Sequence, residues 1–582
     1  MKINRKPIYI ILLPILLSGC TNTSVSLGAS SSSGNVEKIF IEETAPFYTD
    51  TGNIRGEIVK KQVATFEYGY WDTAPLVIYM TFDTALNYLF NNEVEVSWEN
   101  DVVTYECPDD LKFIVDINEG TILAHNYDEI NLFSKKYDSK FGLIDEETTT
   151  DYVIDNNSTY IGGEDVLFNL KDYSMTIYKV NDKAYVPYNV INTLTFNYAL
   201  WSSVNFNGEG FYFLDLLTNA VGLSNTNSQY TRDYYYGPYS TTSARRRPYF
   251  VEHNYNSFMF QLDHFYGFRD EKMVPFNDYL TKNYPNVVKQ LKADNETDYC
   301  RGVEAVMEAI IGDGHTNTGN ATSAFARGTY AMGNYTSERS NKLGSDYGIC
   351  YSQRYNALGI NGTGLRFSGN TAILGFDGFY HQGIKFTTSN ISNYTKYDGF
   401  ALFYDAFKQI GKKSNIRNVI FDITCNGGGD TNALIPMLAF LSDKVDMTMY
   451  SPLTKLTAKL SYKVDTNLDG EYDEKDNYQD KYNFYVLTSN YSFSCANLFP
   501  QICKEMGIAT IIGQQSGGGA CVVYYSATPD GKPYRISSNM RDGDPNHPSR
   551  HNDSGIPVDY TIDVQNFYND EYLTNFVNNL AE

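Results

Sequence analysis

Residues 484–498, FYVLTSNYSFSCANL, contain the strand-to-helix junction on which the interpretation of this chain rests. The apolar run at 484–487 predicts a buried strand, the small residues after it predict a turn, and a helix is expected from about Leu498. A serine at such a junction can expose its hydroxyl while backbone N–H groups face the atom that it attacks. Ser494 is therefore a candidate nucleophile. Serine is also a common helix N-cap, and the local pattern taken alone favours that simpler role.

Strands and helices alternate on both sides of this junction. Strands are expected at 371–376, 419–423 and 508–512, and helices at 400–410 and 433–441. This order predicts an α/β domain with a substantially parallel sheet, whose ligands bind beyond the carboxyl ends of the strands. The glycine turn at 426–429 and Ser494 would both lie at that edge. The turn offers unobstructed backbone N–H groups, as an oxyanion hole requires, and an ordinary tight turn is the alternative.

A helical region precedes this domain. From about Arg246, helices are expected at 255–265, 276–283, 287–291 and 298–311. The last of them ends at Gly312-Asp313-Gly314-His315, where an imidazole can project into a cleft. Because a serine hydroxyl needs a base before it can attack an amide, His315 is the candidate base. An ordinary helix-terminal histidine is the alternative.

The first part of the mature chain carries no recognisable chemistry. Residues 36–200 alternate strand-like runs with turns and are expected to form a strand-rich α+β accessory domain, followed by a connector at 201–245. Since this region has no histidine cluster and no glycine-rich phosphate loop, spacing or substrate recruitment is its expected role. The formal net charge of −23 argues against nucleic acid and anionic membrane surfaces as electrostatic partners.

The N-terminus has the pattern of a secretory signal. Lys2, Arg5 and Lys6 precede the apolar run at 8–17, which is too short for a stable membrane span. The run ends in Leu-Ser-Gly-Cys at 17–20, which resembles the bacterial lipobox. That resemblance implies a signal peptide at 1–20, a lipid on Cys20 and a protein anchored on the extracytoplasmic face of the cell membrane. Polar residues at 21–35 are expected to form a flexible tether.

Several motifs occur together in one order along the chain. They are Asp-Gly-His-Thr at 313–316, Asp422 with the glycine turn at 426–429, Ser492 with Ser494 and Asn497, Ile512-Gly513, and Gly555-Ile556 with Asp559. Together they resemble the C-terminal processing (tail-specific) serine peptidase family over about 246–564. The resemblance implies a peptidase domain at 246–582, with a helical part at 246–320 and a crotonase-like α/β core at 350–582. It also implies Ser494 as the nucleophile, with oxyanion donors at Gly428 and Cys495, and no organic cofactor.

Differences from the family pattern indicate which branch of the family this chain resembles. The Ser–Lys branch has its lysine about 25 residues after the serine, where this chain has Gly517-Gly518-Gly519. The chain therefore resembles the tricorn-like branch, whose base is a histidine, and His315 takes that position. Asp553 is the acid nearest to the position of the branch's glutamate, so it is our candidate for orienting the imidazole. Little room remains between His315 and Thr371 for a PDZ domain, and none is expected.

A separate motif at 465–476, DTNLDGEYDEKD, has the spacing of an EF-hand-type calcium loop. Its glycine stands at position 6, and position 12 is aspartate instead of glutamate. The alternative is a solvated acidic surface loop. We expect a structural Ca²⁺ bound by side-chain oxygens at positions 1, 3, 5, 9 and 12 and a backbone carbonyl at position 7, which correspond to Asp465, Asn467, Asp469, Asp473, Asp476 and Glu471.

Two functions remain open from the sequence. The first is a membrane-anchored extracytoplasmic serine endopeptidase that cleaves protein or peptide substrates through a Ser–His acyl-enzyme mechanism. The second is a catalytically inactive member of the same family that binds peptides or hydrophobic ligands, because a fold does not determine a function. The seven cysteines other than Cys20 do not form a recognisable disulfide framework, and pairing among Cys425, Cys495 and Cys521 stays open.

Overall fold

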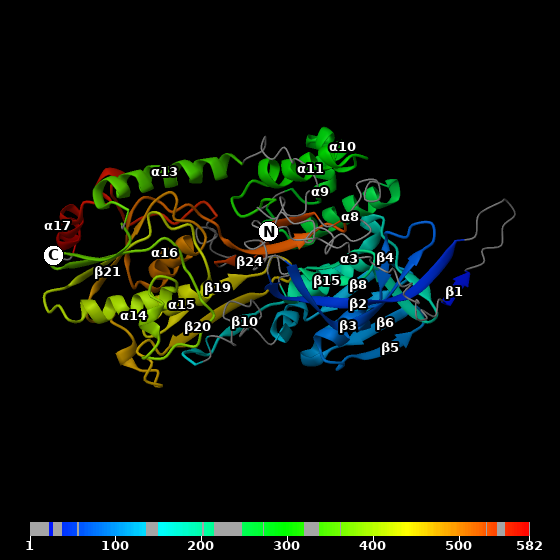
Figure 1. Ribbon diagram of the computed structural model, residues 1–582, viewed down its shortest axis with the longest axis horizontal. Helices are drawn as coiled ribbons and strands as arrows, with labels where there is room; N and C mark the ends of the chain where they lie inside the picture. The colour runs from blue at the N-terminus through cyan, green and yellow to red at the C-terminus, as the bar shows by residue number, and fades with distance from the viewer. Residues whose placement is uncertain are drawn as a thin grey trace, which may run out of the picture.

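The computed structural model describes residues 23–26, 38–54, 57–134, 149, 151–200, 203–214, 247–271, 273–318, 337–360, 362–530, 532–543 and 553–580. The expected signal peptide, including Cys20, lies outside them. In Figure 1 the accessory strands, coloured blue to cyan, occupy one half of the molecule, and the yellow to red elements of the C-terminal part occupy the other. None of the helices in the described part has the length and apolarity that a membrane crossing requires.

The candidate nucleophile follows a strand of a six-stranded sheet. In spatial order the strands are β16 (Gly364–Ser368), β17 (Thr371–Gly375), β18 (Asn418–Asp422), β21 (Asn483–Thr488), β22 (Thr510–Gly513) and β25 (Tyr560–Thr561). Only β16 is antiparallel to its neighbour, and all other pairs are parallel. The prediction of a mixed α/β fold with a substantially parallel sheet is therefore confirmed.

Helices cover both faces of this sheet (Figure 1). On one face lie α14 (Gly399–Ile410), α15 (Thr431–Ala439) and α16 (Cys495–Met506), and the ring of Phe421 from β18 stacks on Phe403 with centroids 5.1 Å apart. On the other face α13 (Glu338–Leu358) and α17 (Asp570–Leu580) pack on a cluster that contains Ile420, Leu487 and Val577. Because both faces are buried, the strands are continuous apolar runs, as expected for parallel sheets.

A second sheet connects the two halves of the molecule. Its antiparallel strands are β23 (Cys521–Ala527), β24 (Pro533–Asp542), β19 (Val445–Tyr450), β20 (Thr457–Val464), β10 (Thr159–Ile161) and β9 (Val153–Asp155). Strands β9 and β10 come from the expected accessory domain, yet they pair with β20. The accessory region is thus joined to the C-terminal part by backbone hydrogen bonds.

The accessory region contains two further sheets. One has the order β12 (Tyr178–Val180), β13 (Lys183–Pro187), β4 (Ile78–Met80), β3 (Glu57–Trp71), β2 (Ile39–Ile54), β15 (Phe211–Leu214) and β14 (Ser203–Phe206), with β1 (Thr23–Ser26) on β2. The other has the order β11 (Val166–Asn169), β8 (Thr121–His125), β7 (Lys112–Asp116), β6 (Val102–Glu106) and β5 (Glu95–Glu99). Helix α1 (Phe82–Leu89) packs on the second sheet, where the rings of Phe82 and Phe113 stack 4.9 Å apart.

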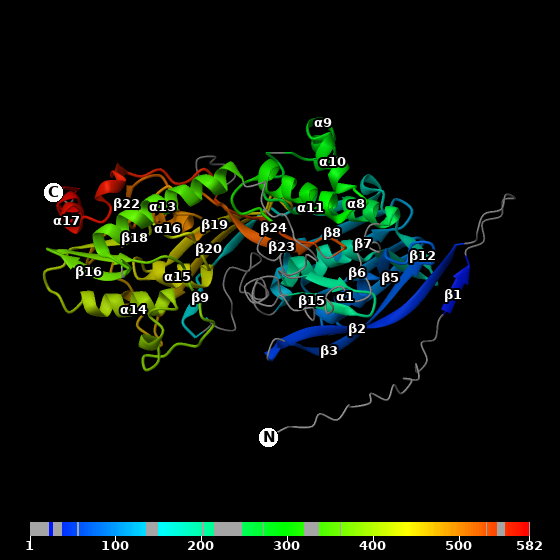
Figure 2. The same ribbon diagram turned by 45° about the horizontal axis from the view of Figure 1, so that its top comes forward.

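Some strands lie where the sequence predicts none. Strand β1 falls within the expected tether, and β14 and β15 fall within the expected connector, most of which lies outside the described residues. Phe211 of β15 is fully buried in the main core, which explains why this segment joins the accessory sheet. The long β2–β3 hairpin lies along the lower side of the molecule in Figure 2.

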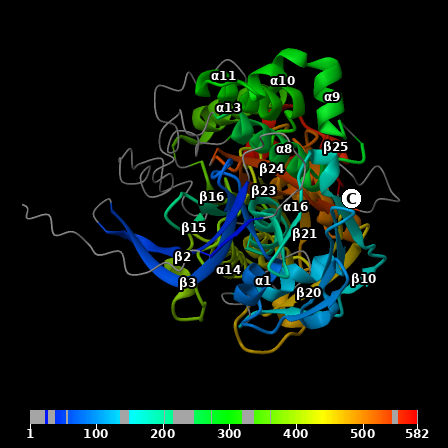
Figure 3. The same ribbon diagram turned by 90° about the vertical axis from the view of Figure 1, so that its right-hand side faces the viewer.

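The expected helical part is present before the parallel sheet. It consists of α8 (Pro248–Phe265), α9 (Phe276–Asn283), α10 (Pro285–Leu291) and α11 (Glu296–Glu304), and a π-helical segment at Ala305–Ile311 continues α11. Figure 3 shows α9, α10 and α11 gathered along one edge of the molecule. The residues that follow, 312–318, contain His315. Across the described residues the seven cysteines are buried and free.

Candidate active site

Ser494 has an unusual backbone conformation at the junction of β21 and α16. Its φ of 58° and ψ of −123° lie where residues with a side chain are strained. Its N–H donates to the Gly518 carbonyl at 2.8 Å, and its side chain makes no capping hydrogen bond to α16. Ser494 is half-buried, while Ser492, Phe493 and Cys495 around it are buried. The hydroxyl is therefore presented at the surface and is not used as a helix cap.

The glycine turn that follows β18 packs directly against this serine. A Cβ atom on Gly428 would lie 2.7 Å from the Ser494 Cβ and 3.1 Å from the Cys495 nitrogen, and Gly428 has a φ of 109°. Only glycine fits this position. The structure thus brings Gly428, Ser494 and the Cys495 amide together from two separate loops at the carboxyl ends of neighbouring strands.

The two expected oxyanion donors differ in their present hydrogen bonding. The Gly428 N–H donates to Oδ1 of Asn426 at 2.9 Å. The Cys495 N–H, at the first turn of α16, has no hydrogen-bond acceptor among the described residues, as is common for the first amides of a helix. The Cys495 amide is therefore the donor that is free to bind an oxyanion.

His315 lies against the nucleophile turn. Its ring contacts the ring of Phe493, the residue before Ser494, with centroids 4.7 Å apart. Buried Asp313 holds the histidine turn, because its Oδ1 accepts the N–H groups of His315 and Thr316 at 3.1 and 2.6 Å. Gly314 has a φ of 88°, and a Cβ there would lie 2.9 Å from Cζ of Phe493. The close approach of the two turns explains why glycine precedes the histidine.

Burial determines the protonation state of His315. Desolvation, together with the nearby cations Arg535 and Arg339, lowers the pKa of His315 to about 3. The imidazole is therefore neutral at physiological pH, as a general base must be. Its Nδ1 has no hydrogen-bond partner in the described structure, and its carbonyl accepts a hydrogen bond from Nε of Arg535 at 2.7 Å.

Asp553 is bound to a cation in this structure. Nη1 of Arg339 donates to its carboxylate, and Nη2 of Arg339 donates to the carbonyls of Asp553 and Gly517, the latter at 2.8 Å. The Arg339 guanidinium also lies 5.5 Å from the centre of the Phe493 ring. No hydrogen bond joins Asp553 to His315 within the described residues. Asp553 thus lies beside the nucleophile turn with its carboxylate bound to Arg339.

Two residues of the site were missed from the sequence. Arg339 and Phe493 link the histidine, acid and serine segments, and no local pattern marks either residue. The second glycine run, 517–519, was noted only as the position where the Ser–Lys branch has its lysine, and its contact with the serine turn was not predicted. A Cβ on Gly519 would lie 2.9 Å from the Ser494 nitrogen, so this run packs beneath the nucleophile turn.

The expected calcium loop folds as a compact turn. Asp465 accepts the N–H groups of Asp469 and Gly470 at 3.1 and 2.7 Å, and Asp476 accepts those of Thr466 and Asp473 at 2.9 and 3.0 Å. Both carboxylates are buried. Among the described residues, no group of three or more histidine, cysteine or acidic side chains is arranged to hold a metal. Burial, together with the nearby Asp465 carboxylate, raises the pKa of Asp476 to about 6.

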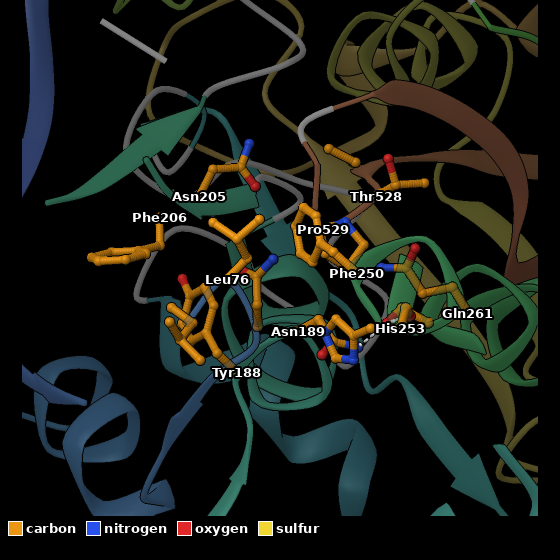
Figure 4. A pocket seen from close by; sticks show the side chains of 14 residues that line it. Leu76, Tyr188, Asn189, Asn205, Phe206, Phe250, His253, Gln261, Thr528 and Pro529 are labelled. Atoms are coloured by element: carbon orange, nitrogen blue, oxygen red, sulfur yellow. Dashed lines mark hydrogen bonds between the residues drawn. The ribbon is translucent and has the colours of Figure 1, made fainter. Parts of the chain in front are cut away.

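A small cavity of about 40 Å³, partly open to solvent, lies apart from these residues (Figure 4). It lies where the accessory region meets α8 and the β23–β24 turn, and contains none of the predicted site residues. Its lining includes Tyr188, Asn189, His253, Gln261, Thr528 and Pro529.

Several solved structures are similar to part of this chain, with low overall superposition. A protein of Parabacteroides merdae assigned as a peptidase is 18% identical, covers 57% of this chain and 97% of its own, and has a TM-score of 0.39. The photosystem II D1 C-terminal processing protease is 16% identical with a TM-score of 0.25 over 33% of this chain and 42% of its own. A lipoprotein from Streptococcus agalactiae is 15% identical with a TM-score of 0.27 over 39% of this chain and 74% of its own.

No curated protein matches the sequence. A family model does match part of it. The matched segment includes Gly428, Ser494, Cys495 and Asp553 but not His315, and it covers under a third of the chain. Residues 386–562 of this chain match the model of peptidase family S41.

Proposed function

We propose that this protein is a serine endopeptidase whose nucleophile is Ser494. The observation that carries the proposal is the strained backbone of Ser494, which presents a free hydroxyl beside Gly428 and the unoccupied Cys495 amide. A strained strand-to-helix turn of this kind is how unrelated serine hydrolases expose their nucleophile. The family S41 match over the same residues supports peptide-bond hydrolysis. A crotonase-like core for residues 350–582 is part of this proposal.

Each residue of the proposed site has one role in the reaction. Neutral His315 takes the proton of the Ser494 hydroxyl while the oxygen bonds to the scissile carbonyl carbon. It then returns this proton to the leaving amine, which yields the acyl-enzyme, and a water molecule releases the acyl group by the reverse sequence. The Cys495 N–H stabilises the oxyanion. The Gly428 N–H becomes a second oxyanion donor once its hydrogen bond to Oδ1 of Asn426 is broken.

The orienting role of Asp553 requires a rearrangement. Its carboxylate now binds Arg339, while Nδ1 of His315 lacks a partner. We propose that Asp553 leaves Arg339 and accepts the Nδ1–H of His315 when substrate is bound. This step would fix the ring orientation and stabilise the imidazolium that forms during the reaction.

Labelling with a fluorophosphonate tests the nucleophile. Wild type and Ser352→Ala, which alters an exposed serine on α13, are expected to be labelled, and Ser494→Ala is expected not to be. Labelling of Ser494→Ala at the wild-type rate would remove Ser494 as the nucleophile. Failure to label the wild-type protein would instead favour a peptide-binding function without catalysis.

Calcium binding by the 465–476 loop is a second proposal. Its support is chemical, since buried Asp465 and Asp476 are close enough for one to raise the pKa of the other, and a cation would relieve that repulsion. When bound, Ca²⁺ would supply structural cross-linking of the loop through the residues named above. Added Ca²⁺ is expected to raise the melting temperature of EDTA-treated wild type but not of Asp465→Ala. An equal response of both proteins would contradict the proposal.

We also propose that the protein is anchored to the extracytoplasmic face of the membrane through a lipid on Cys20. The support is the basic, apolar and Leu-Ser-Gly-Cys pattern of residues 1–20. Replacing Cys20 by Ser is expected to abolish incorporation of a labelled fatty acid and to release the protein from the membrane fraction. Unchanged incorporation would place the lipid elsewhere.

A further inference from the structure

Helix α13 exposes a row of aromatic side chains. Tyr347, Tyr351 and Tyr355 follow each other at intervals of four residues, so they lie on one face of the helix. They are 36%, 41% and 53% exposed, and neighbouring rings stack with centroids 5.6 and 6.4 Å apart. Soluble proteins seldom expose large apolar side chains in a contiguous row unless the row binds a partner.

The row continues into the candidate active site. The ring of Tyr347 packs on the ring of Tyr491 with centroids 4.8 Å apart, and Tyr491 stands three residues before Ser494. The Tyr491 hydroxyl lies against the glycine turn, since a Cβ on Gly427 would be 2.6 Å from it. The tyrosines therefore form a continuous surface that ends at the proposed oxyanion turn. We call Tyr347, Tyr351, Tyr355 and Tyr491 the tyrosine row.

A further exposed tyrosine lies near this end of the row. Tyr380 is 55% exposed and follows Phe379, whose N–H donates to the Gly428 carbonyl at 3.0 Å. Burial raises the pKa of Tyr491, and nearby Tyr347 and Tyr380 raise it further. Tyr491 therefore has tyrosine neighbours from α13 and from the segment after β17.

Charged neighbours of the row are already paired. Arg354 donates to both carboxylate oxygens of Asp377 at 2.5 and 2.8 Å, and Lys342 pairs with Asp346 at 2.7 Å. The chain as a whole carries a net charge of −23, which disfavours acidic partners. We therefore expect recognition at this surface to come from aromatic stacking and apolar burial.

The length of the row fits an extended peptide. Eight residues separate Tyr347 from Tyr355, which is about 12 Å along a helix at about 1.5 Å per residue. An extended chain at about 3.3 Å per residue covers that distance with about four residues. About four substrate residues would thus cover the helix part of the row, and the residues after them would continue past Tyr491 towards Ser494.

We propose that the tyrosine row binds the substrate polypeptide on one side of the scissile bond and selects extended segments with aromatic or large apolar side chains. This inference rests on the proposed peptidase function and specifies its substrate class. Because the row lies outside the reacting atoms, it contributes to the binding of long substrates and not to the chemical step. Short substrates that do not reach α13 gain nothing from it.

The test compares long and short peptides. Cleavage sites are first mapped by mass spectrometry in an unfolded protein such as reduced casein. Two fluorogenic peptides are then built around one site, a long one with aromatic residues on both sides and a short one that spans only two residues on each side. The double variant Tyr351→Ala/Tyr355→Ala is expected to raise KM for the long peptide about tenfold, with kcat within about twofold of wild type. KM for the short peptide is expected to be unchanged.

Two control proteins distinguish stacking from loss of structure. The double variant with Phe at positions 351 and 355 keeps the rings and is expected to keep the wild-type KM. Tyr160→Ala removes a tyrosine of similar exposure, 37%, on β10, and is expected to leave both peptides unaffected. Equal KM values of wild type and the alanine double variant for the long peptide would overturn the proposal.

Failure of this inference can be told apart from failure of the proposed function. Fluorophosphonate labelling of the alanine double variant should match wild type, because Ser494 is untouched. If wild type is labelled but its KM for the long peptide does not depend on the row, only the docking surface is wrong. If wild type is not labelled and cleaves neither casein nor peptide, the peptidase function itself is wrong, and the substrate class falls with it.

Discussion

Replacing Gly428 by Ala tests the proposed site most directly. The new methyl group would lie 2.7 Å from the Ser494 Cβ, 2.8 Å from the Phe493 carbonyl oxygen and 3.1 Å from the Cys495 nitrogen. Contacts this short force the glycine turn away from the serine, which displaces one oxyanion donor and crowds the other. Loss of an oxyanion donor costs about 10²- to 10³-fold in rate, or about 2.7–4 kcal/mol. The φ of 109° adds backbone strain of about 1–3 kcal/mol to the folded state.

A matched variant separates these two effects. Gly364 has a φ of 97°, but a Cβ there would meet nothing within 4 Å. Both variants are therefore expected to lose about 1–3 kcal/mol of unfolding free energy in urea titrations. Only Gly428→Ala is expected to reduce the second-order rate of fluorophosphonate labelling by at least about 10²-fold. A Gly428→Ala protein that is labelled within about threefold of the wild-type rate would refute the assigned oxyanion turn.

Three more predictions concern the histidine turn. Because burial lowers the pKa of His315 to about 3, the fall of the labelling rate at low pH, its acid limb, should have its midpoint well below pH 6.5. Between about pH 6.5 and 3 the folded state binds fewer protons than the unfolded state, so the free energy of unfolding that depends on His315 falls as the pH decreases. Urea titrations at several pH values should show this pH dependence in wild type and not in His315→Gln. Arg339→Ala removes a cation that lowers the pKa of His315, so its acid limb should move to higher pH, while Arg339→Lys should retain the wild-type limb. Gly314→Ser should lose about 1–3 kcal/mol of stability and most of the labelling rate, because its side chain would displace Phe493 beside Ser494.

Each of these three expectations has a result that contradicts it. An acid limb near pH 6.5 in the wild-type protein would mean that His315 is solvated or is not the base. An unchanged limb in Arg339→Ala would separate Arg339 from the electrostatics of His315. Wild-type labelling by Gly314→Ser would show that the histidine and serine turns do not need their close contact.

Local patterns correctly predicted the elements that surround the site. The strands β17, β18, β21 and β22 are short apolar runs bounded by turn residues, and their parallel pairing follows from the helices between them. The helix that ends before His315 was predicted at 298–311 and is found as α11 with its π-helical continuation. These features depend on residues close together in the chain, so periodicity reveals them.

Sheet membership could not be predicted in the same way. Strands β9 and β10 pair with β20, about 300 residues later, and β14 and β15 join the accessory sheet from a segment expected to be a connector. Edge pairing of short strands depends on which edges are left open after the cores have packed. The sequence of three or four residues does not encode that choice.

The sequence by itself determined the identity of the candidate nucleophile, base and oxyanion turn, because each stands in a local pattern of strand, glycine and helix. Only the tertiary structure decided how they meet. Arg535 binds the carbonyl of His315, and Arg339 binds Asp553, across 220 and 214 residues of sequence. Contacts between residues this far apart arise from packing, so the protonation of His315 and the present partner of Asp553 follow from burial and neighbouring charge, which no local motif records.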